Sequence, residues 1–160
     1  MKEQILCALH STNIPKEYSL ENQKRVLKIV LQILELNQNV IVKGLGILEQ
    51  YSSGCPILDR GLRLVRDGLE PDYIETILLN TAIANNIDLL TVLVVMEGVY
   101  AIQTIQPPYI TRELLKSYFT FEFEKEFDSG INSSNIKLND VQSLNAKEIA
   151  QLVNSIPTTM

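Results

Sequence analysis

The sequence predicts an all-α fold, a compact bundle of about five to seven helices, and three observations support this. The chain has 160 residues, of which 46% are hydrophobic, which is enough for one domain with a sizeable core. Its apolar residues recur at steps of three and four, the spacing of amphipathic helices. Proline, glycine and serine stand where such helices begin and end.

The first helix is predicted to begin after Ser19, a residue type that caps helix N-termini. A polar run at 37–39 interrupts its apolar face, and the pattern resumes at Val40, so the helix either runs through or bends there. Gly44 and Gly46 each weaken a helix by about 1 kcal/mol relative to alanine, and we expect them to let another helix approach closely. The apolar residues on the repeating face are Val26, Leu27, Val30, Leu31, Ile33 and Leu34.

The next helices follow from glycine and proline. Gly68 is placed to end a helix as its C-terminal cap. Pro71 and Pro108 are placed to open helices, because the missing N–H of proline has no partner in a first helical turn. The predicted helices span 57–67, 71–84, 87–103 and 108–118.

Two segments of this region resemble each other. Residues 60–80 and 97–117 align without gaps at an offset of 37. Each is a helix, a turn and a proline-opened helix, and such a hairpin buries its apolar face only against a neighbour. We therefore expect two repeated helical hairpins that dock on each other; the alternative is chance similarity. The identical pairs include Gly61 with Gly98, Pro71 with Pro108, and Leu78 with Leu115.

The segment from Thr76 to Thr111 carries only two charges, Asp88 and Glu97. Such a neutral segment is either a central core helix or a face pressed against another subunit. Glu97 is either a rim residue or, together with Tyr100, part of a small-ligand pocket. The sequence places no second carboxylate to work with Glu97, so we expect no enzymatic activity.

The residues after Phe119 alternate aromatic and charged side chains, as FEFEKEF. A single strand would lack a partner for its backbone groups. We therefore expect a frayed helix end or an extended arm that docks on another chain. Asn145 and Glu148 predict a capping box for a short terminal helix through Val153. The predicted organisation is a leading arm or short helix at 1–18, a helical body at 19–120 and a partly ordered C-terminal arm at 121–160.

Composition excludes several classes of function. One histidine, His10, and two cysteines outside any CxxC pair, Cys7 and Cys55, leave too few ligands for a zinc site, and we expect no cofactor. A net charge of −5 with no basic segment argues against nucleic acid. The densest apolar stretch, at 89–96, is far shorter than the roughly 20 residues that cross a bilayer. We expect a soluble, cytoplasmic protein without a membrane span.

Three arginines, Arg60, Arg63 and Arg66, follow one another at three-residue spacing, flanked by Asp59 and Asp67. On a helix they cover about a third of the circumference. They either grip carboxylate or phosphate groups of a partner or form a solvated face with local ion pairs.

The chain contains KGLGILEQ followed by ILDRGLRLVRDGLEPDYIETIL, and later VVMEGVYAIQTIQPPYITRELLKSYF. The first two resemble a cytoplasmic segment of the bacterial flagellar stator protein MotA, and the third is similar to the segment after that family's last membrane helix. Together they cover roughly residues 20–120. The four membrane helices of that family have no counterpart here, so ion conduction is not implied. Ile105 stands where the family usually has glycine, and we expect that turn to be capped differently.

The resemblance implies a non-enzymatic helical module that acts by protein contact, with the flagellar rotor switch protein or a second copy of this chain as partner. The family's acidic contact residue corresponds to Glu49. Its basic contact residue corresponds to Ile41, and Lys43 partly substitutes for it. The predicted contact surface comprises Lys43, Glu49, Arg60, Arg63 and Arg66.

Two alternatives remain. One is an adaptor or regulator unrelated to motility, which oligomerises or holds its partner through the neutral segment and the aromatic arm at 118–127. The other is an enzyme or a binder of a small ligand that uses a pocket around Glu97 and Tyr100.

Overall fold

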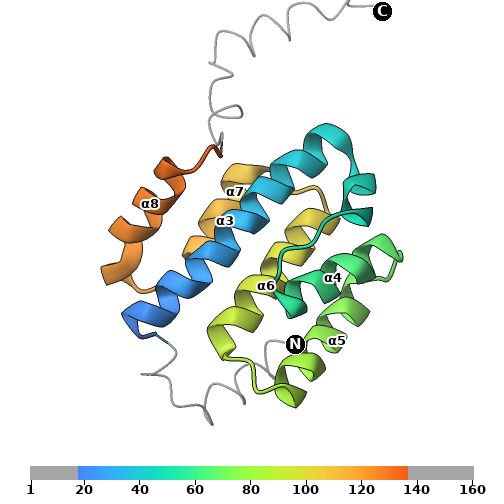
Figure 1. Cartoon of the computed structure of the whole chain (residues 1–160), viewed down its shortest axis with the longest axis horizontal. Coiled ribbons are helices and arrows are strands. Elements are labelled where there is room, and N and C mark those ends of the chain that lie inside the picture. The colour runs from blue at the N-terminus through green and yellow to red at the C-terminus, as the bar shows by residue number, and fades with distance from the viewer. Residues whose placement is uncertain (1–17, 137–160) are drawn as a thin grey trace, which may run out of the picture.

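The chain folds as an assembly of helices around α6, as a computed structural model that describes residues 18–136 shows (Figure 1). This confirms the predicted all-α fold. Residues 1–17, with Cys7 and His10, and residues 137–160, with the helix predicted after Asn145, lie outside the described range. The elements are α3 (Leu20–Lys43), the 3₁₀ helix η1 (Leu45–Glu49), α4 (Pro56–Arg66), α5 (Pro71–Ala84), α6 (Leu89–Gln103), α7 (Pro108–Lys116), the 3₁₀ helix η2 (Phe121–Phe123) and α8 (Glu124–Ser133).

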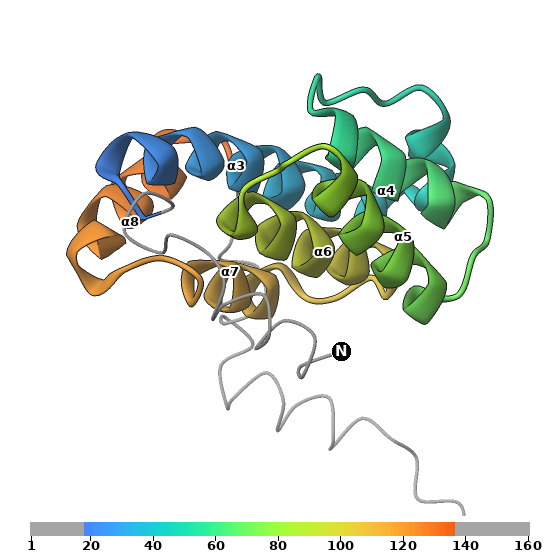
Figure 2. The same ribbon diagram turned by 90° about the horizontal axis from the view of Figure 1, so that it is seen from below.

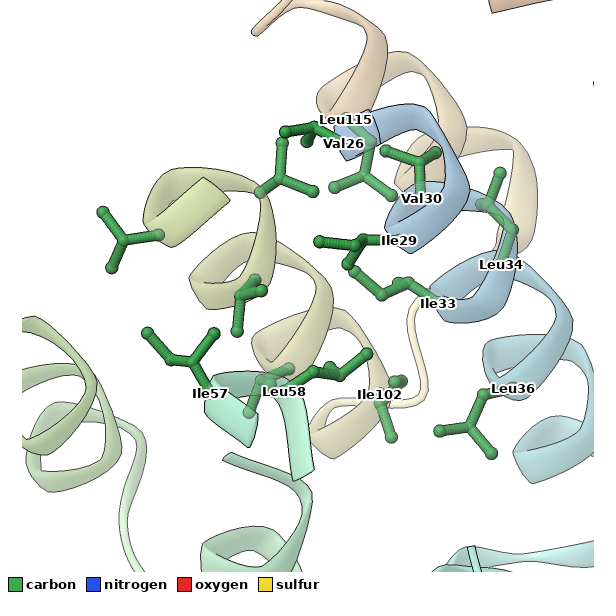
Figure 3. Packing of buried hydrophobic residues seen from close by; sticks show 14 of the residues in the cluster. Val26, Ile29, Val30, Ile33, Leu34, Leu36, Ile57, Leu58, Ile102 and Leu115 are labelled. Carbon is green, nitrogen blue, oxygen red and sulfur yellow. The ribbon is translucent and has the colours of Figure 1, made fainter. Parts of the chain in front are cut away.

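Helix α6 is the centre of the bundle. It contacts α3, α4, α5 and α7, and Figure 1 and Figure 2 show it between α3 and the α4–α5 hairpin. Side chains from α3, α4, α6 and α7 meet in one apolar cluster, where Ile33, Leu58 and Ile102 are fully buried (Figure 3). The core interpretation of the neutral segment is therefore confirmed for α6. Within residues 18–136, no helix has both the length and the apolar character that crossing a bilayer requires.

Helix α3 continues without interruption through the polar residues at 37–39. The hydroxyl of Ser19 accepts a hydrogen bond from the backbone N–H of Asn22 at 3.2 Å, as predicted for its N-cap. Asn37 is buried and donates its side-chain amide to the carbonyl of Gln106 at 3.1 Å, which satisfies part of its polar group inside the core. The helix ends at Lys43, and Gly44 follows as its C-cap with a φ of +82°, a conformation that glycine adopts at little cost.

The two repeated hairpins, α4–α5 and α6–α7, share their turn geometry. Gly68 and Ile105 stand at matched positions, with φ of +77° and +52°. In each turn the next backbone N–H donates to the carbonyl five residues earlier, from Leu69 to Leu64 at 3.1 Å and from Gln106 to Ala101 at 2.8 Å. The expectation that the Ile105 turn is capped differently is therefore wrong, because both turns have the same hydrogen bonds. These bonds hold Ile105 in a left-handed conformation, which branched side chains disfavour.

Matched glycines lie where helices meet most closely. A Cβ on Gly98 would lie 2.5 Å from Cδ1 of Ile33 in α3, and a Cβ on Gly61 would lie 2.6 Å from Cγ2 of Val99 in α6. We expected close approach at Gly44 and Gly46, and this expectation is wrong, since no atom lies within 4 Å of a Cβ built at either residue. The reason is that α3 ends before it reaches them.

We predict that Gly98→Ala lowers the free energy of unfolding by about 1–2 kcal/mol. Higher helix propensity contributes about 1 kcal/mol, but overpacking costs about 1–3 kcal/mol, and three atoms of the buried Ile33 side chain lie within 3 Å of the new methyl group. Urea denaturation measures the change. Gly46→Ala is the matched control and should cause no loss. A Gly98→Ala, Ile33→Ala double variant should lose less than the sum of its single variants.

The first part of the predicted C-terminal arm, at 121–133, is helical. It forms η2 and α8, and α8 packs against α3 of the same chain. Phe119, Phe123 and Phe127 are buried. The ring centroid of Phe119 lies 5.5 Å from that of Phe123 and 5.2 Å from that of Phe127. Phe119 lies in the turn after α7, Phe123 ends η2 and Phe127 belongs to α8, so the packing of these three elements brings the rings together, and the local alternation of FEF gave no sign of it. The expectation of a frayed helix end or of an extended arm that docks on another chain is therefore wrong for residues 119–133.

Ion pairs also connect α8 to α7. Asp128 accepts hydrogen bonds from the guanidinium of Arg112 at 2.7 Å and from the ammonium of Lys116 at 3.0 Å. Burial acts to raise the pKa of Asp128, but these two cations outweigh it and hold the pKa below its usual range. The predicted boundary at 120/121 thus falls inside one continuous body.

We predict that Phe127→Ala lowers the free energy of unfolding by about 3–5 kcal/mol, the usual cost of truncating a buried phenylalanine. Phe121→Ala is the matched control. Its ring is 91% exposed, and the change should stay within about 0.5 kcal/mol. Chemical denaturation followed by circular dichroism compares the two variants. Equal small effects would contradict the packed position of α8.

Candidate functional site

The structure exposes all five residues of the predicted contact surface, which we call the charged surface. Lys43 ends α3, Glu49 ends η1, and the three arginines project from α4. Because η1 packs against both α3 and α4, the charged surface spans three neighbouring elements. Its members are Lys43, Glu49, Arg60, Arg63 and Arg66.

Two arginines of the charged surface lack a carboxylate partner. Arg66 pairs with Asp67 at 3.2 Å. Asp59 instead accepts hydrogen bonds from the backbone N–H and the hydroxyl of Ser53, each at 2.7 Å. Among residues 18–136, no carboxylate lies within ion-pair distance of Arg60 or Arg63. The predicted face of local ion pairs is therefore present only at Arg66.

A second candidate site is a cavity of 360 Å³ between α5, α6 and the residues after α7, which we call the acidic cleft. It contains both residues of the predicted pocket, Glu97 and Tyr100. Apolar side chains form most of its wall, and three carboxylates line it together with two tyrosines and one glutamine. The lining residues are Pro71, Asp72, Ile74, Glu75, Leu78, Leu93, Met96, Glu97, Val99, Tyr100, Gln103 and Tyr118.

The sequence placed no second carboxylate beside Glu97, and the structure adds two, since Glu75 and Asp72 line the same cleft. They come from the first turns of α5, and only the packing of α5 on α6 brings them near Glu97. Sequence reasoning missed Gln103 and Tyr118 for the same reason, because their spacing along the chain gives no sign that they share a cavity.

The polar groups of the acidic cleft are mostly hydrogen bond acceptors. Tyr118 donates its hydroxyl to Oε2 of Glu97 at 2.9 Å, and Gln103 donates its amide to the carbonyl of Leu69 at 2.7 Å. Oε1 of Glu75 and Oε1 of Gln103 are buried, and no described group donates to either. Buried acceptors without donors are rare in folded proteins, so these two oxygens mark the cleft as incomplete.

Burial shifts two ionisation equilibria in the cleft. Burial raises the pKa of Glu75, and the nearby charge of Asp72 raises it further. Burial also raises the pKa of Tyr118 well above that of a free tyrosine, with a further contribution from the charge and hydrogen bond of Glu97. Within residues 18–136, no three histidine, cysteine, aspartate or glutamate side chains gather closely enough to hold a metal ion.

Comparison with family models, with curated proteins and with solved structures finds no match to this chain.

We predict that Tyr118 makes the protein more sensitive to alkali. The pKa of Tyr118 is raised in the folded state, so its contribution to stability is present below the unfolded pKa of about 10 and is lost as pH rises through the folded pKa. Tyr118→Phe should therefore lose less stability than the unmodified chain above about pH 10. Urea denaturation at a series of pH values measures this.

A second variant separates the causes. Glu97→Gln keeps an acceptor for the hydroxyl and removes only the charge. Because burial is the largest cause, the pKa of Tyr118 should fall only part of the way to its ordinary value, as followed by tyrosinate absorbance. A complete return would contradict burial as the main cause.

Proposed function

We propose that this chain is a non-enzymatic protein-interaction module that resembles the cytoplasmic part of the flagellar stator and acts in the cytoplasm. It binds a protein partner through the charged surface and conducts no ions. One observation carries this proposal: Arg60 and Arg63 are exposed, and no described carboxylate pairs with them.

The charge of the surface indicates the chemistry of the partner. Four of its five residues are basic, so an acidic face on the partner complements it. Guanidinium groups bind carboxylates in a bidentate geometry. Exposed pairs of this kind speed association and set specificity more than they raise affinity, and salt screens them.

The resemblance to the stator family favours the rotor switch protein as this partner. Glu49 stands at the family's acidic contact position, and Lys43 lies two residues from its basic one. Lys43 is the last residue of α3 and Glu49 is the last residue of η1, and both side chains are exposed. A second copy of the chain is the other partner that the sequence indicates.

The alternative adaptor would oligomerise or hold its partner through the neutral segment and the residues at 118–127, where Ile83, Ile110 and Phe121 are among the exposed apolar side chains. Most of α6 is buried in the core of its own chain, and so are Phe119, Phe123 and Phe127. Such side chains are not available to a partner unless the fold opens.

The test is the affinity of the full chain for the purified rotor switch protein, measured by calorimetry at two salt concentrations. We predict that an Arg60→Glu, Arg63→Glu double variant binds at least about tenfold more weakly, since each lost rim pair is worth up to about 1 kcal/mol and reversal adds repulsion. Lys28→Glu is the matched control. Lys28 is exposed on α3, outside the charged surface, and its reversal should leave the affinity within about twofold.

Several results would reject parts of this proposal. Equal binding by the double variant and the control would remove the site assignment. Failure of the unmodified chain to bind at low salt would remove the rotor switch protein as partner. Sedimentation of the unmodified chain and the double variant then decides whether the charged surface joins two copies of this chain.

A further inference from the structure

We propose that the acidic cleft binds a small organic cation, an ammonium or guanidinium group carried on an apolar or aromatic body. The proposal goes beyond the contact function above, because the cleft lies between α5 and α6 and shares no residue with the charged surface.

The first argument is the shortage of hydrogen bond donors. Oε1 of Glu75 and Oε1 of Gln103 are buried without a described donor, and Glu97 accepts from Tyr118. An ammonium group carries three donors and no acceptor, and a guanidinium carries five. Such a ligand supplies what these oxygens lack, whereas a carboxylate or phosphate would add acceptors to a site that already has too many.

The second argument is charge. Three carboxylates line the cleft, those of Asp72, Glu75 and Glu97, and no lysine, arginine or histidine appears among its described lining residues. A cation bound there relieves the repulsion between like charges. An anion would meet repulsion without a compensating partner.

The third argument is the apolar wall and the size of the cavity. Leu93, Met96 and Val99 of α6 line it, and the half-exposed Tyr100 adds an aromatic ring, a group whose π face attracts cations. The volume of 360 Å³ falls within the roughly 300–1,000 Å³ of small-molecule sites. It accommodates an amine with one aromatic ring.

The experiment compares three probes of similar shape on the full chain: phenethylamine, 2-phenylethanol and 3-phenylpropionate. Calorimetry should show saturable binding of the amine, with a dissociation constant on the order of 1 mM or lower. The neutral alcohol should bind at least about tenfold more weakly, and the anion should not bind. A fourth probe, a capped lysine amide, carries the same ammonium on an aliphatic stem and represents a lysine side chain of a protein.

Variants locate the binding. Glu97→Gln and Glu75→Gln each remove one charge from the cleft and should weaken amine binding at least about tenfold. Glu122→Gln is the matched control, since Glu122 is exposed on η2 and its loss should leave the affinity unchanged. The methyl resonance of Met96, one of three methionines in the chain, should shift on titration of the unmodified protein with the amine.

Each contrary result overturns the proposal. Equal binding of amine and alcohol would show that the charge is not recognised. Binding of the capped lysine amide without phenethylamine would show that the cleft takes a protein side chain instead. An unmoved Met96 methyl signal would place the ligand elsewhere, and this measurement does not depend on whether the glutamine variants fold. The Arg60→Glu, Arg63→Glu variant should bind the amine normally, so failure here and failure of the proposed function are distinguishable.

Discussion

The burial of α6 is the constraint on which the rest of the structure depends. Its apolar residues contact four other helices, and the absence of a side chain at Gly98 brings α6 against Ile33 of α3. Gly61 does the same for α4 against Val99. Close packing of this kind fixes the distance between helices, because interiors leave little free volume. These contacts hold the helices that carry the charged surface and line the acidic cleft in place.

One helical hairpin contributes residues to both candidate sites. The turn at Gly68 returns the chain from α4 to α5, so the exposed arginines of α4 and the carboxylates of α5 belong to one hairpin. Helix α4 carries the exposed Arg60, Arg63 and Arg66, and α5 contributes Asp72 and Glu75 to the acidic cleft. Asp59 of α4 accepts a hydrogen bond from the backbone N–H of Ser53 and pairs with no arginine of the charged surface.

Much of the fold could be predicted from the sequence, because helix boundaries depend on neighbouring residues. Ser19 accepts its capping hydrogen bond, and Pro71 and Pro108 each open a helix, as local chemistry requires. The arginine face of α4 could also be predicted, since arginines at three-residue spacing share a helix face without any tertiary partner. The burial of Phe127 could not be predicted, because it depends on a surface of α3 about a hundred residues earlier in the chain.

The sequence by itself therefore determined helices α3 to α7, most of their ends and the spacing of the arginines on α4, because these depend on hydrogen bonds and spacings within a few residues. Only the tertiary structure decided that α8 closes onto α3 and that Glu75 and Tyr118 join Glu97 in one cavity. Contacts between distant segments follow from how whole helix faces pack, and no local pattern in the chain specifies which buried oxygens are left without a donor.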